Sequence, residues 1–130
     1  MKKTISILLA AWFVAFSLAA SAAGLPAAYS AQRLQALQAE GKTVLVDVHA
    51  DWCPTCRAQH AVIEKLLKEP ALSRIAELRL DWDAQRTEAR AMGAPQQSTL
   101  MLYRGGKRIA MSVAETREGP LREFLAQGSK

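Results

Sequence analysis

A mostly apolar, β-branched run at residues 43–50 (TVLVDVHA) constrains the fold of this chain more than any other segment. Val and Leu fill most of its positions, so neither face of the expected strand suits contact with water. Strands buried on both faces are typical of parallel sheets that carry helices on both sides. A helical pattern follows within a few residues, which predicts a strand–helix unit of an α/β protein.

Hydrophobic spacing places further elements along the chain. Helices are expected at residues 31–40, 57–69, 71–77, 87–92 and 118–127, and further strands at 78–82, 98–103 and 108–113. The RGGK sequence at 104–107 is typical of a hairpin turn, which makes the last two strands antiparallel. The first two strands need a parallel crossover. The order therefore predicts an α/β fold with a mixed four-stranded sheet and helices on both faces.

The first 23 residues have the layout of a secretory signal peptide. Two lysines follow Met1, residues 5–23 carry no charge, and small residues gather before an Ala-Ser-Ala cleavage site at 20–22. An uncleaved membrane anchor is the alternative, since nineteen apolar residues can just span a bilayer. We expect one exported, periplasmic domain at residues 24–130.

The charge of that domain is unremarkable. Removing the signal takes away two lysines and no acid, so the formal charge falls from +5 to +3. A small excess spread along the chain gives no reason to expect nucleic acid as a partner. About 107 residues suffice for one core, and we expect a monomer.

The only two cysteines, Cys53 and Cys56, lie where the buried strand gives way to a helix. A disulfide that closes so short a loop constrains the unfolded chain very little, so a structural role explains the pair poorly. Pro54 suits the first helical turn because its missing N–H costs nothing there. The free N–H groups and positive dipole end of the helix favour the Cys53 thiolate, which is the attacking species in disulfide exchange. Cys56, one turn further, is suited to resolve the mixed disulfide.

Around the cysteines, the sequence VDVHADWCPTC resembles the active-site signature of the thioredoxin superfamily, and the resemblance covers nearly all of residues 24–130. It implies a three-layer thioredoxin-like fold, Cys53 as nucleophile, Cys56 as resolving thiol, and a redox-active disulfide with no cofactor or metal. Asp47 matches the family's buried acid that exchanges a proton with the resolving cysteine; a purely structural hydrogen-bonding role is the alternative. Arg79 falls where members often carry a lysine near that acid.

The sequence departs from the family in GAPQQSTLMLY at residues 93–103. Members place a cis-proline directly before the Thr-Leu of this strand; here Ser98 occupies that position, and Pro95 comes three residues earlier. A cis bond before serine would cost about 3–4 kcal/mol, so we expect a trans Gln97–Ser98 peptide. The resemblance assigns the substrate surface to Trp52, Pro54, Gln97 and Ser98, with the Gln97 main chain facing an extended peptide.

Two other functions remain open at this point. The only histidines, His49 and His60, flank the cysteines as H-x3-C-x2-C-x3-H. Without a proline over the sulfurs, Cys53, Cys56 and His60 are candidate ligands for zinc or copper. The second alternative is a redox-inert thioredoxin-like binding module.

The direction of electron flow follows from what the domain lacks. No histidine lies between the cysteines to stabilise the thiolate strongly, and residues 24–130 leave no room for the extra domains of the family's oxidases and isomerases. The resemblance therefore implies a reductase or interchange protein. We expect it to act on disulfides of exported proteins and to be recharged by a membrane-bound electron donor.

Overall fold

The computed structural model describes residues 26–130, and the expected signal segment lies outside them. The elements in chain order are β1 (Ala27–Ala28), α1 (Ala31–Ala39), β2 (Val44–His49), α2 (Pro54–Leu66), β3 (Ala76–Asp81), α3 (Arg86–Ala91), β4 (Thr99–Arg104), β5 (Lys107–Val113), α4 (Glu118–Ala126) and a short 3₁₀ helix, η1 (Gln127–Ser129). Within these 105 residues, no helix has the length and apolar character needed to cross a membrane.

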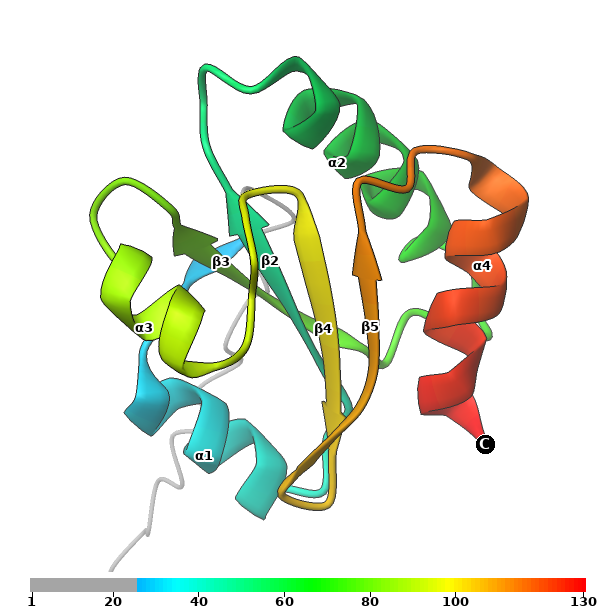
Figure 1. The fold of residues 1–130 in the computed structure, drawn as a ribbon. Helices are drawn as coiled ribbons and strands as arrows, with labels where there is room; N and C mark the ends of the chain where they lie inside the picture. Colours follow the sequence, from blue (N-terminus) through cyan, green and yellow to red (C-terminus); the bar gives the residue numbers. More distant parts are fainter. Residues whose placement is uncertain (1–25) are drawn as a thin grey trace, which may run out of the picture.

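The sheet has the order β1-β3-β2-β4-β5. Strands β1, β3 and β2 run parallel, whereas β4 is antiparallel to both β2 and β5. The central strand is β2, and all six of its residues are buried, as the apolar run predicted. The predicted mixed sheet with helices on both faces is confirmed (Figure 1). A two-residue β1 adds a fifth strand to the four expected.

Alternate side chains of β2 point to two separate cores, because successive residues of a strand face opposite sides of the sheet. Val44, Val46 and Val48 pack with Leu34 of α1 and Ala89 of α3. Leu45 packs on the other face with residues of α2 and α4. Figure 1 shows α1 and α3 on one side of the sheet and α2 and α4 on the other. Both layers thus anchor the β2–α2 junction that carries the cysteines.

The helix expected at residues 71–77 is wrong. Residues 71–74 form turns, with the Leu72 N–H donating to Glu69 O at 2.9 Å and the Ile75 N–H to Leu72 O at 3.0 Å. The Ala76 N–H then donates to Thr43 O at 2.9 Å, which starts the parallel pairing of β3 with β2. This pairing places Ala76 and Glu77 in the sheet. The tertiary contact thus overrides the local helical preference of the segment.

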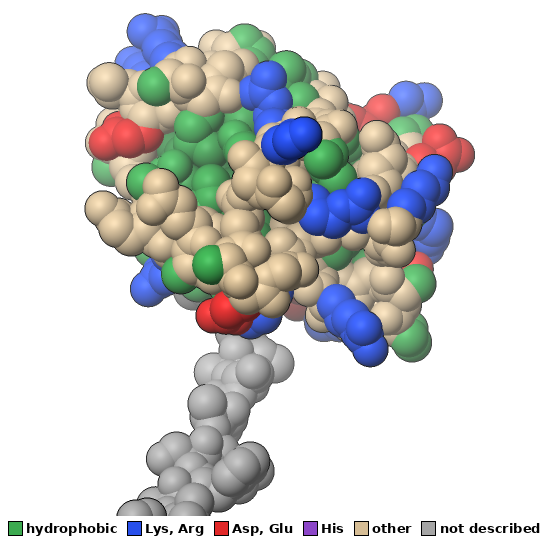
Figure 2. Space-filling model, turned by 90° about the horizontal axis from the view of Figure 1, so that it is seen from below, with side chains coloured by type: hydrophobic (Ala, Val, Ile, Leu, Met, Phe, Trp, Pro, Cys, Tyr) green, Lys and Arg blue, Asp and Glu red, His purple; other side chains and the backbone are tan. Residues whose placement is uncertain are grey.

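The helix expected at residues 57–69 begins earlier and ends earlier, at Pro54 and Leu66. The predicted Gly-Gly hairpin is present: Gly105 and Gly106 have φ of 59° and 78°, which a tight turn between antiparallel strands requires. Figure 2 shows the end of the molecule away from the β2–α2 junction. On that face, Lys and Arg side chains are separated by uncharged and acidic ones.

Candidate active site

Cys53 is the N-cap residue of α2, directly before Pro54 at the first helical position. Its sulfur accepts a hydrogen bond from the Cys56 N–H at 3.2 Å. Burial alone would raise the pKa of the Cys53 thiol. Hydrogen bonds from the Cys56 and Ser98 side chains and from the main-chain N–H groups of Cys56 and Thr55 outweigh burial and lower this pKa. The helix start therefore favours the thiolate, as the strand-to-helix position predicted.

Cys56 lies one turn inside α2 and is 1% exposed. Burial raises the pKa of its thiol, and the hydrogen bond to Cys53 raises it further. Both cysteines are free thiols in this structure. The pKa values of the two thiols are thus shifted in opposite directions, which distinguishes an attacking thiol, Cys53, from a resolving thiol, Cys56.

Ser98 places its hydroxyl against both sulfurs, 3.3 Å from Cys53 Sγ and 3.1 Å from Cys56 Sγ. The side chain is buried. A hydroxyl in this position can donate a hydrogen bond to whichever sulfur is ionised. The residue where family members carry proline therefore contributes a polar group to the reacting atoms.

The main chain around Ser98 explains why the hydroxyl points there. Its N–H donates to Val48 O at 2.8 Å, and its carbonyl accepts from the Ala114 N–H at 2.9 Å and from Gln59 Nε2 at 3.4 Å. These partners hold Ser98 at φ 60°, in the left-handed region that residues other than glycine seldom occupy. Between residues 26 and 130 there is no cis peptide, so the Gln97–Ser98 bond is trans as expected.

The residues assigned to the substrate surface surround this centre. Trp52 is 58% exposed, and its indole N–H donates to Asp83 Oδ2 at 2.8 Å. Pro54 is exposed beside it, whereas Gln97 is half-buried. The Gln97 main chain forms no hydrogen bond with the rest of the described chain. Its N–H and carbonyl are therefore available to another chain.

Asp47 lies on the face of β2 that α2 covers, and it is 1% exposed. Its Oδ2 is 3.6 Å from His49 Nδ1 and 3.8 Å from Arg79 Nε. Arg79 stands directly opposite Asp47 in the β2–β3 register, which explains this contact. Within residues 26–130 neither carboxylate oxygen has a hydrogen-bond partner, so no bond joins Asp47 to Cys56. Its assigned role toward the resolving cysteine stays a prediction.

His60 lies four residues beyond Cys56 on α2, but its ring turns toward β3. Nδ1 of His60 is 3.6 Å from Glu77 Oε1. Over the described residues, His60 groups with Asp47 and Glu77, and the alternative ligand set of Cys53, Cys56 and His60 does not come together. That set is wrong because both sulfurs turn to Ser98 while His60 faces the sheet.

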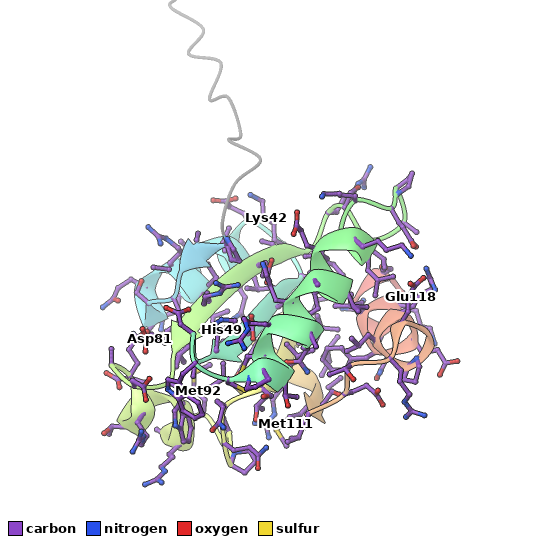
Figure 3. All side chains as sticks on the ribbon, turned by 90° about the horizontal axis from the view of Figure 1, so that it is seen from above. Lys42, His49, Asp81, Met92, Met111 and Glu118 are labelled. Atoms are coloured by element: carbon purple, nitrogen blue, oxygen red, sulfur yellow. The ribbon has the colours of Figure 1, made fainter. Side chains whose placement is uncertain are left out.

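Glu77 was not predicted as a site residue, because the sequence pattern placed it at the end of the helix expected at 71–77. Burial, followed by the neighbouring Asp47 charge, raises the pKa of Glu77 to about 7. Burial and then the Arg79 charge lower the pKa of His60. His49 is buried, with its ring centroid 6.2 Å from that of His60. Figure 3 shows His49 inside the molecule beside α2.

This fold and site define a dithiol redox protein. Two cysteines whose thiol pKa values are shifted in opposite directions lie at the start of a helix that covers a mixed sheet. The thioredoxin family model matches residues 28–127, so the chain belongs to the thioredoxin family. Among solved structures, Trxlp from Edwardsiella tarda EIB202 is similar, with 37% identity, a TM-score of 0.73, and coverage of 78% of this chain and 98% of that one.

Curated relatives are similar over shorter stretches. Thioredoxin of Chlamydia muridarum is 39% identical over 70 residues, which is 54% of this chain and 67% of that protein. The thiol:disulfide interchange protein DsbE of Yersinia pestis is 53% identical over 32 residues, 25% of this chain and 17% of that protein. The chain is therefore a thiol-disulfide oxidoreductase of the thioredoxin family, a finding that argues against a redox-inert binding module.

Proposed function

We propose that this protein reduces or interchanges disulfides of exported proteins in the periplasm, by dithiol exchange at Cys53 and Cys56. The observation that supports this proposal is that the pKa of the Cys53 thiol is lowered and that of the Cys56 thiol is raised, while both sulfurs contact the Ser98 hydroxyl. The basic and apolar first 23 residues favour export. The partial similarity to a thiol:disulfide interchange protein supports the proposed disulfide exchange.

The exchange proceeds in two displacements. The Cys53 thiolate attacks one sulfur of a substrate disulfide; a Cys53–substrate S–S bond forms as the substrate S–S bond breaks, and the departing thiolate takes up a proton. Cys56 then loses its proton and attacks the Cys53 sulfur, which releases the second substrate thiol and closes the Cys53–Cys56 disulfide. The substrate gains two electrons and two protons. An external dithiol, which we place on a membrane-bound donor, must then supply two electrons and two protons to the Cys53–Cys56 disulfide before the next turnover.

Substrate docking is assigned to the exposed ring of Trp52 and the unpaired main chain of Gln97. An extended peptide that pairs with the Gln97 N–H and carbonyl would lie across the Cys53 sulfur, in the manner of an added β-strand. This surface needs no second copy of the chain, and we propose that the protein acts as a monomer. The redox couple is the cysteine pair itself.

The reduction potential tests the proposed direction of electron flow. No side-chain cation contacts Cys53 within the described residues. The thiolate is stabilised only by the start of α2 and by hydrogen bonds, so the reduced form should not be favoured strongly. We expect a potential below about −150 mV, together with catalysis of insulin-disulfide reduction by dithiothreitol. Equilibration with glutathione buffers, read by mass spectrometry, measures the potential. A value well above that limit would make the protein an oxidant and overturn the proposed direction.

A further inference from the structure

A group of buried polar side chains lies beneath α2, one turn beyond Cys56. It consists of Asp47 from β2, His60 from α2 and Glu77 from β3, and one donor atom from each lies within 4.8 Å of the others. We infer that these three side chains form a binding site for a divalent transition-metal ion of the zinc type. The inference goes beyond the proposed function and uses neither sulfur.

The burial of Asp47 is the first argument for an ion. The side chain is almost fully buried, and neither of its oxygens has a hydrogen-bond partner within residues 26–130. Nδ1 of His60 and Oε1 of Glu77, which face the same space, also lack one. A buried polar group without a partner is costly, and a buried charge more so, unless a counter-charge or ligand complements it. A cation between these atoms would supply that complement.

The neighbouring cation does not satisfy the hydrogen-bonding groups of this cluster. Arg79 contributes the nearest cation, but its Nε is 3.8 Å from Asp47 Oδ2, beyond hydrogen-bond distance. Nε and Nη2 of Arg79 are themselves buried without a partner. Two carboxylate side chains thus lie near one guanidinium, which forms an ion pair with Asp47 but no hydrogen bond with either carboxylate.

The donor set selects the class of ion. One imidazole nitrogen with two carboxylate oxygens is a ligand set that zinc accepts, and three protein ligands leave a fourth position for water. Magnesium and calcium prefer oxygen ligands throughout, and copper(I) prefers sulfur. The donors stand on two paired strands and the helix packed over them, a rigid support for a metal site.

Two further features fit an ion at this place. The side chains of His60 and Glu77 are 21% and 12% exposed, so this part of the group borders solvent. His49 Nδ1 is 3.6 Å from Asp47 Oδ2, and a nitrogen at that position can help to orient the carboxylate.

The test is zinc binding by the full, untagged chain with Cys53 and Cys56 closed as a disulfide, so that the thiols cannot take the metal. After removal of bound metal with EDTA and dialysis, calorimetric titration with Zn²⁺ should give one site per chain, and Mg²⁺ should give no binding. His60→Gln and Glu77→Gln should each weaken zinc binding at least tenfold. Glu123→Gln is the matched control, because Glu123 is exposed on α4, which carries none of the three donors; it should bind like wild type.

Thermal unfolding by circular dichroism provides a second measurement that does not depend on the variants. Zinc should raise the Tm of the oxidised wild type, and EDTA should reverse the rise, because a ligand that binds only the folded state stabilises it. The inference is overturned if the oxidised chain shows neither zinc binding nor a Tm rise. It is also overturned if both substitutions leave the affinity unchanged, or if zinc binds only the reduced chain and is lost with Cys53→Ser.

Discussion

Substitution of Cys56 by serine is expected to turn the enzyme into a trap for its substrate. The Cys53 sulfur keeps its place at the helix N-cap and its hydrogen bonds from the Cys56 main chain and the Ser98 hydroxyl. It therefore still attacks a substrate disulfide, but no second thiol lies within reach to release the product. The mixed disulfide should accumulate at one per chain, and turnover with insulin should fall at least about 1,000-fold, or about 4 kcal/mol in barrier.

Substitution of Cys53 by serine is the paired experiment. A serine hydroxyl is not ionised near neutral pH, so the first displacement should fail, with the same loss of turnover and no trapped substrate. Non-reducing electrophoresis and intact mass spectrometry distinguish a trapped complex from free protein. Trapping by Cys53→Ser and not by Cys56→Ser would reverse the two roles. Wild-type turnover by either variant would contradict dithiol exchange.

Replacement of Ser98 by alanine should have the next largest effect. The hydroxyl is a hydrogen-bond partner of the Cys53 sulfur and helps to lower its pKa. A hydrogen bond to a charged group is worth about 1.5–3 kcal/mol, so its loss should raise the pKa of Cys53. We expect alkylation of Cys53 at pH 6 to slow at least about tenfold, with the rate at high pH little changed.

Ser112→Ala is the control for this experiment. This substitution also removes one serine hydroxyl, but from β5, where Ser112 pairs with Leu100. The hydroxyl that contacts the two sulfurs is that of Ser98, not of Ser112. Alkylation of Cys53 in this variant should follow the wild-type curve. Equal reactivity of the Ser98→Ala variant and wild type at pH 6 would show that the serine hydroxyl does not stabilise the thiolate.

The parts of the fold and site that the sequence predicted are those encoded by neighbouring residues. The apolar composition of residues 43–50 by itself predicts a buried strand, and β2 is buried along its whole length. Cys53, Pro54 and Cys56 reveal a helix start by their spacing alone, because capping and the proline at the first helical position are local effects. These residues sufficed to identify the redox pair.

The role of Ser98 was not accessible from the sequence. Its alignment with the family proline placed it near the cysteines, but its contact with both sulfurs depends on a left-handed φ. That conformation is fixed by bonds to Val48, Gln59 and Ala114, which come from three segments distant in the chain. Proline at this position could not reproduce it, since Ser98 donates its N–H to Val48 and proline has none.

Glu77 was missed for a related reason. Residues 71–77 have the composition of a helix, and only the pairing of Ala76 with β2 shows that Glu77 belongs to a strand beneath α2. The grouping of Asp47, His60 and Glu77 is a consequence of the β2–β3 register and of helix packing. Residues 30 positions apart carry no local signal of such contacts.

The most direct test of the account is the pH dependence of alkylation of each cysteine in the reduced wild-type protein. Iodoacetamide labelling with peptide mass spectrometry reports the two sites separately. The midpoint of each curve is the quantity to compare, because Cys53 is only 4% exposed and its absolute rate also reflects access. We predict a Cys53 midpoint below that of a free cysteine, about 8.5, and a Cys56 midpoint above it. Two curves that both coincide with free cysteine would contradict the account.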